Sequence, residues 1–194
     1  TQAWENAQVQ NHRAKFCSQS EADAGLCTLS SVPSGDTNSA LFFESVNDNS
    51  LKKEARLAFI NNLMGAPFQK ISGTPTNLQA QQYLFEQNRY TSLMSIPAYS
   101  FAMIDAEHTR SEGLNQSPIE QLDSRIGTYF GGEDAAKWAS SIAVQAPRGL
   151  LVETAKIEGL AAWQNFKMVE QNNRILANIA ALTLVSSPIQ SRLE

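Results

Sequence analysis

Residues 147–186 read PRGLLVETAKIEGLAAWQNFKMVEQNNRILANIAALTLVS. Pro147 suits the first position of a helix, and Pro188 marks its expected end. Between the two prolines, large apolar side chains recur at helical spacing, which predicts one long helix with a buried stripe. We expect this stripe to comprise Leu151, Leu160, Trp163, Met168, Ile175, Ile179, Leu182 and Val185. A helix of about 40 residues spans on the order of 60 Å, which is longer than a compact domain of this size needs.

A second long helical pattern covers residues 75–112. Pro97 lies in its middle, where it removes a backbone hydrogen bond and crowds the preceding turn, so we expect a kink or break there. The side chains predicted to be buried along this helix are Leu78, Leu84, Phe85, Leu93, Ile96, Phe101 and Ile104.

Local signals predict several shorter helices. Ser50 suits an N-cap and Gly65 a stop, so one helix should cover residues 51–64. The clearest start is Ser117-Pro118-Ile119-Glu120, a capping box with proline at the first helical position, and it predicts a helix to about residue 130. Further helices are expected at residues 1–15, 18–25 and 133–144.

No segment alternates polar and apolar residues over a useful length, so no β-strand is predicted. The sequence therefore predicts an all-α protein with a single domain over residues 1–194. In this interpretation residues 1–50 form a disulfide-bearing extension and loop, and residues 51–194 form an elongated helical bundle with two long helices. Residues 40–43 are the one apolar run in the N-terminal loop and should pack on the core.

Composition limits the classes of partner. The chain has 194 residues, 42% of them hydrophobic and 18% charged, and a net charge of −4. A negative chain without a basic run is a poor ligand for nucleic acid or anionic lipid. Its longest apolar stretch, residues 179–185, is far shorter than the roughly 20 residues that cross a bilayer. The expected partners are therefore other proteins, including a second copy of the chain, with no direct membrane span.

Cys17 and Cys27 have nine residues between them. This spacing favours a structural disulfide closing a small loop, which would place the protein in an oxidising compartment, periplasmic or extracellular. Zinc would need further ligands, and His12 is the only candidate in reach. Two free thiols in a cytosolic protein remain the other alternative.

Motifs for catalysis are weak. There is no glycine-rich phosphate loop and no G-x-S-x-G elbow. Asp105, His108 and Glu112 would share one helix face, but their spacing matches no common metal motif, and we interpret them as a solvated polar face. The acidic residues Glu153 and Glu158 do not by themselves indicate a hydrolase. We therefore assign no catalytic, cofactor-binding or metal-binding residue and expect a protein that is not an enzyme.

Aromatic side chains allow two interpretations. They form either a patch that binds a partner or part of the core. Trp4 stands in an otherwise polar segment, so it either packs on the bundle or contacts a partner. The candidate interaction residues are Trp4, Tyr129, Phe130, Trp138 and Trp163.

The segment FCSQSEADAGLC at residues 16–27 resembles the cysteine-bracketed stretch of envelope proteins encoded among bacterial conjugative-transfer genes, those of type IV secretion systems and integrative conjugative elements. In that family an N/D-rich loop with a short aromatic run follows, as residues 36–38 and 41–43 do here. The similarity covers about residues 12–65. It implies export to the periplasm and a non-catalytic part in building or gating a transfer channel or pilus, and it brings no catalytic residues.

The long helices also resemble those of a minor pilus component of such systems, from which the N-terminal disulfide segment departs. Two alternatives stay open beside this structural or assembly role. One is an exported adhesin or effector that binds a surface partner, and the other is a periplasmic peptidoglycan hydrolase.

Overall fold

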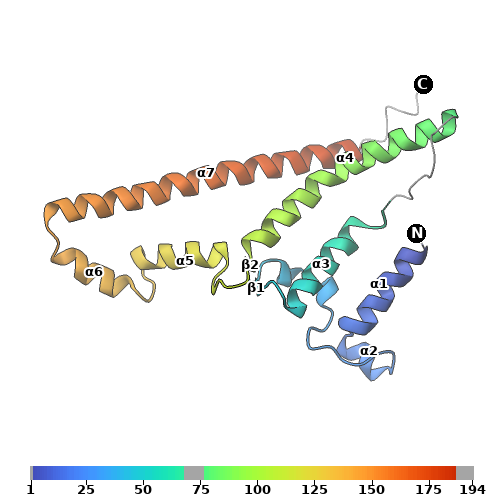
Figure 1. Cartoon of the computed structure of the whole chain (residues 1–194), viewed down its shortest axis with the longest axis horizontal. Helices are drawn as coiled ribbons and strands as arrows, with labels where there is room; N and C mark the ends of the chain where they lie inside the picture. Colours follow the sequence, from blue (N-terminus) through green and yellow to red (C-terminus); the bar gives the residue numbers. More distant parts are fainter. Residues whose placement is uncertain (1, 68–76, 187–194) are drawn as a thin grey trace. The chain divides into compact units, whose positions relative to one another are not determined.

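A computed structural model describes residues 2–67 and 77–186, with side chains up to residue 184. This part of the chain contains seven α-helices, two short 3₁₀ helices and two strands of two residues each. Internal contacts divide the chain into two compact units, Thr1–Pro118 and Ile119–Glu194. The two longest helices, α4 and α7, are drawn in green and in orange to red in Figure 1. The all-α class is thereby confirmed, whereas the arrangement of the helices as a bundle stays a prediction.

The first unit contains most of the elements. Two helices precede the loop, α1 (Gln2–Lys15) and α2 (Gln19–Asp23). The loop contains η1 (Gly35–Thr37), η2 (Ser39–Phe42) and the strand β1 (Val46–Asn47). The helices α3 (Leu51–Met64) and α4 (Leu78–Glu107) and the strand β2 (Thr109–Arg110) complete it.

The core of this unit is small and lies where η1 and η2 pack against α3. Four buried side chains form its central cluster: Phe16, Leu41, Ala55 and Ala58. Val32 and Leu51 are partly buried and pack against this cluster. Gly35 permits the close approach, because a Cβ there would lie 2.7 Å from the Cβ of Ala55. The expected packing of the aromatic run is confirmed for Leu41 and Phe42, whereas Phe43 is exposed.

Helix α3 begins and ends as its capping residues predict. The hydroxyl of Ser50 accepts a hydrogen bond from the backbone N–H of Lys53 at 3.2 Å. At the other end Gly65 adopts a φ of 74°, a left-handed value that favours glycine. The prediction for residues 51–64 is therefore confirmed at both ends.

Arg56 of α3 is fully buried and joins three segments. Its guanidinium donates to the carbonyl oxygens of Leu41 and Glu44 and to the carboxylate of Asp105, the last at 3.0 Å. Lys53 forms a second ion pair with Asp105, whose side chain is 14% exposed. Burial of a charge is tolerated only where partners satisfy it, as these do.

The interpretation of Asp105, His108 and Glu112 as a solvated helix face is therefore wrong for Asp105. Helix α4 ends at Glu107, His108 is its C-cap, and Glu112 lies beyond it. The chain instead turns into β2, which pairs in parallel with β1, Val46 beside Thr109 and Asn47 beside Arg110. This short pairing was not predicted, because two residues are too few to show an alternating pattern.

Pro97 does not interrupt α4, which is helical over 30 residues. Of the predicted kink or break, the break is therefore absent, and the kink stays a prediction. The predicted burial along this helix is wrong for Leu78 and Phe85, which are 69% and 66% exposed, whereas the other five predicted residues are half-buried.

The second unit contains three helices: α5 (Pro118–Tyr129), α6 (Ala135–Ala143) and α7 (Pro147–Ser186). The boundary between the units follows Pro118, the first residue of α5. Helix α7 has 40 residues and begins at Pro147 as predicted. The predicted burial of its apolar stripe is wrong, because Leu160 is half-buried and the other described members are exposed. The burial of Val185 and the stop at Pro188 lie outside the described residues.

Candidate functional site

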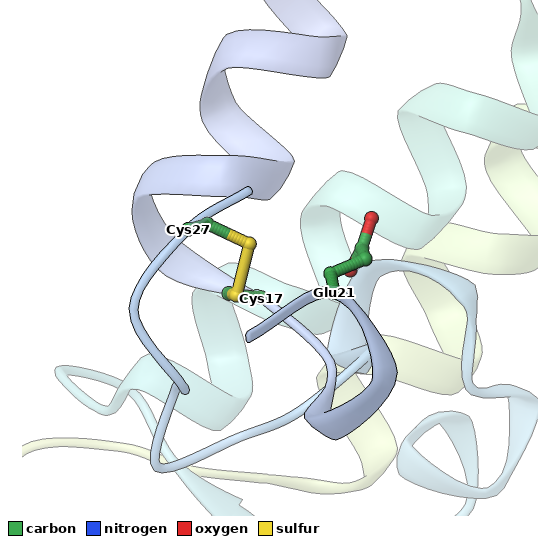
Figure 2. Close-up of side chains that lie close together, drawn as sticks. All are labelled: Cys17, Glu21 and Cys27. Carbon is green, nitrogen blue, oxygen red and sulfur yellow. A yellow bond between two sulfur atoms is a disulfide. The ribbon is translucent and has the colours of Figure 1, made fainter. Parts of the chain in front are cut away.

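Two features of the chain are candidates for function: the disulfide segment with its surrounding charges, and the apolar surface of α7. The disulfide joins Cys17 to Cys27, with their Cα atoms 6.0 Å apart, and confirms the predicted pairing. Figure 2 shows this bond with the side chain of Glu21, from α2, beside it. In the chain-entropy model a loop of this length stabilises the folded state by roughly 2–3 kcal/mol.

Helix α2, inside the disulfide loop, is closed at both ends. Ser18 and Glu21 form a reciprocal capping box, in which the hydroxyl of Ser18 accepts from the N–H of Glu21 and the Glu21 carboxylate accepts from the N–H of Ser18. Gly25 follows the helix with a φ of 72°, and the N–H of Leu26 donates to the carbonyl of Glu21. These are the bonds of a Schellman motif. The S-x-x-E spacing could have revealed the capping box from the sequence.

The carboxylate of Glu21 has a further partner in His12 of α1. Nε2 of His12 lies 2.8 Å from Oε2 of Glu21, and Nδ1 lies 2.8 Å from Oδ1 of Asp36. The hydrogen bonds from the Ser18 side chain, from His12 and from the Ser18 backbone lower the pKa of Glu21 to about 2. His12 and Asp36 stand 24 positions apart, so no local pattern could have predicted their contact.

One group of potential metal ligands occurs among residues 2–67 and 77–184: Cys17, Glu21 and Cys27, with one ligand atom of each within 4.8 Å of the others. Both sulfur atoms belong to the disulfide, and a thiolate is the form of cysteine that binds metal. The Glu21 carboxylate already accepts hydrogen bonds from Ser18 and His12. The oxidised segment is therefore a structural staple, and its donor atoms do not form a metal centre.

The five candidate aromatic residues occupy three places. Trp4 lies on α1 and is half-buried. The rings of Tyr129 and Trp138 meet edge to face at 5.3 Å, and Phe130, 71% exposed, contacts Tyr129 at 6.4 Å. Trp163 on α7 is 45% exposed, with the Lys167 ammonium 5.9 Å from the centre of its ring. The structure thus brings three of the five together in the second unit.

Helix α7 exposes many large apolar side chains. Among the described side chains of α7, only Ala181 is buried. We use the name α7 surface for its twelve exposed large apolar residues: Leu150, Leu151, Val152, Trp163, Phe166, Met168, Val169, Ile175, Leu176, Ile179, Leu182 and Leu184. Single exposed apolar residues are common, whereas a helix that exposes many of them offers apolar area to other molecules. At 3.6 residues per turn the twelve side chains are distributed around α7 and do not form one stripe.

Within residues 2–67 and 77–186, no helix combines the length and the hydropathy that crossing a bilayer requires. The exposed apolar residues of α7 alternate with charged and amide side chains, such as Lys167, Glu170 and Asn172.

Known proteins give no further guide to the site. No protein-family model matches the chain, and no curated protein or solved structure is significantly similar to it.

Proposed function

We propose that this protein is a non-catalytic structural or assembly component of a bacterial cell-envelope apparatus of the conjugation or type IV secretion class, with association with a pilus as the most specific form. Its partners would be protein subunits of that apparatus, including further copies of this chain. Its location would be the periplasm or the cell exterior.

The α7 surface is the single observation that supports this proposal most. Burying a large apolar side chain contributes about 1.5–3 kcal/mol, and α7 leaves twelve of them exposed over its length. A partner that covers even part of this surface would gain substantially from the contact. Helical subunits commonly pair by packing the apolar surfaces of their helices against each other.

The disulfide supports the proposed location. Disulfides persist in oxidising compartments and are rare where thiols are kept reduced. The bond is compatible with a protein outside the cytoplasm, and the periplasm in particular comes from the resemblance of residues 16–27 to the conjugative-transfer family.

Deletion of the gene tests the proposed role. A donor with a clean in-frame deletion should lose conjugation by several orders of magnitude, and a plasmid copy should restore it. Unchanged transfer from the deleted donor would refute the proposal.

Complementation with surface variants then tests α7. The double variant Ile175→Asp/Ile179→Asp places two charges on one face of α7, whereas Asn173→Asp/Ala180→Asp places two charges at exposed positions on another face of the same part of the helix. We expect the first to fail in complementation and the second to succeed, with equal amounts of protein in the periplasm. Equal transfer from both variants would show that the α7 surface binds no essential subunit.

A second candidate function is supported by the cluster of Tyr129, Phe130 and Trp138. Exposed aromatic groups are frequent anchors of binding sites, so an exported adhesin or effector remains an alternative. In that case Phe130→Ser would reduce binding of the purified protein to recipient cells, while conjugation by the deleted donor would stay normal.

A further inference from the structure

Helix α1 itself has no buried residue, although the buried Phe16 and the disulfide-bonded Cys17 follow it directly, and several of its contacts with the first unit are polar. The most enclosed of these is His12, whose Nε2 lies 2.8 Å from Glu21 of α2 and whose Nδ1 lies 2.8 Å and 2.9 Å from the two oxygens of Asp36 in η1. The side chain of Asp36 is only 4% exposed. One histidine therefore links three elements of the unit.

The geometry requires a charged imidazole. A neutral imidazole has one N–H and one lone pair, so it can donate to only one of the two carboxylates. The other nitrogen would then direct its lone pair at a carboxylate, and the nearly buried Asp36 would lose its cation. Only the imidazolium donates at both nitrogens.

The other charged groups near this link are exposed or have their own partners. On α1, Glu5 and Arg13 are exposed, and Lys15 pairs with Glu54 of α3 at 2.5 Å. On α2, Asp23 is exposed and accepts a hydrogen bond from Gln19. The remaining charged side chains in the first half of α3 have their own partners: Lys52 with Glu44, and Lys53 and Arg56 with Asp105. Glu21 and Asp36 are thus the charged groups that face His12 from the elements packed against it.

We propose that protonation of His12 controls the docking of α1: the helix is docked while the imidazole is charged and is released when the imidazole loses its proton. Release would open the groove between α1 and α3 and expose its α3 side, which is lined by Leu57, Ala58 and Asn61. The device would make access to this face of α3 depend on pH.

The direction of the dependence follows from linkage. Partial burial lowers the pKa of His12, but the hydrogen bonds to Glu21 and Asp36 and their charges together raise it above the usual 6.5. A raised pKa in the docked form means that docking is complete below about pH 6.5 and weakens as the pH rises through the docked value. Between these two values the docking equilibrium should fall about tenfold per pH unit.

Fluorine NMR of the full oxidised chain labelled with 5-fluorotryptophan tests this. Trp4 reports on α1, and its signal is assigned by its loss in Trp4→Phe. Between pH 5 and 9 the wild-type signal should move from a docked to a released position, with a midpoint equal to that of the His12 imidazole. In His12→Gln the signal should hold the released position throughout, and in Asp36→Asn the midpoint should move to lower pH.

His108→Gln is the matched control, since His108 contacts a backbone carbonyl on α4 and should leave the transition unchanged. A signal from Trp4 that does not move in the wild type would overturn the proposal. So would a transition that survives in His12→Gln, because a group other than His12 would then be its cause.

Discussion

Helix α3 around Ala55 and the long helix α7 differ in where their apolar residues lie: two of those of α3 are buried in the core, and most of those of α7 are exposed. Ala55 and Ala58 of α3 are buried against Phe16 and Leu41, and the unit closes a small core with few large side chains. Helix α7 has many more large apolar residues, and twelve of them are exposed. The apolar content of a helix therefore does not tell where the core of this protein lies.

The difference indicates two sources of stability. The first unit is held by a core and a buried ion pair, which join segments far apart in the chain, and by a disulfide that closes a short loop. Most of α7 lacks such burial, and isolated helices are at best marginal in water without a packed face. A helix of this kind gains most from a partner, which is why we place the binding function there.

The largest expected effect comes from putting a charge into each region. Ala55→Asp buries a carboxylate in the α3 core and should destabilise the first unit by on the order of 4 kcal/mol or more. Leu160→Asp on α7 would prevent folding if Leu160 were in a buried stripe, but it should cost about 1 kcal/mol because Leu160 is only half-buried. Urea unfolding followed by circular dichroism measures both.

Similar losses of stability in Ala55→Asp and Leu160→Asp would break the comparison. They would mean that α7 has a buried face in solution, and the α7 surface would then be part of the core of the protein. A large loss of stability in Ala55→Asp with a small loss in Leu160→Asp would mean that α7 is not part of the core and can bind a partner.

The sequence predicted the helices well because their ends are local. Ser50, Pro118 and Pro147 act through the first turn that follows them, and Gly25 and Gly65 act through their own φ angles. The disulfide was predicted for a similar reason, since its two cysteines stand close in the chain.

Burial and charge pairing could not be predicted in this way. Helical periodicity shows which residues share a face and leaves open whether anything covers that face. Arg56 meets Asp105 across 49 positions, and His12 meets Asp36 across 24, so each pair depends on the fold as a whole. Pro97 likewise suggested a break that the surrounding helix does not show.

A smaller effect is expected from the buried ion pair. Arg56→Met keeps much of the side-chain volume but leaves Asp105 and two carbonyl oxygens without their donor. We expect a loss of about 3 kcal/mol in the free energy of unfolding, at the low end of the range for broken buried pairs because Lys53 still binds Asp105.

Lys52→Met is the control for Arg56→Met, because Lys52 pairs with Glu44 at the exposed surface at 2.8 Å. Such pairs contribute less than about 1 kcal/mol. If Arg56→Met cost no more than this control, the polar cluster would not hold the first unit together, and its difference from α7 would rest on the apolar core alone.

The smallest expected effect concerns the stability of the disulfide segment at low pH. The pKa of Glu21 is about 2, below its usual 4.5, because its ionised form accepts bonds from Ser18 and His12. A lowered pKa means that the ionised carboxylate stabilises the segment above about pH 4.5, and that this contribution is lost as the pH falls toward 2.

A carbon-13 NMR titration of the Glu21 carboxyl group measures this pKa directly. Ser18→Ala removes the largest cause and should raise the pKa toward 4.5. Ser20→Ala removes a hydroxyl that bonds to Ser18, at 3.2 Å, and is not a cause of the shift, so it should leave the pKa near 2. An unshifted pKa in the wild type would mean that α2 lacks its capping box in solution, so that the disulfide alone would hold this segment.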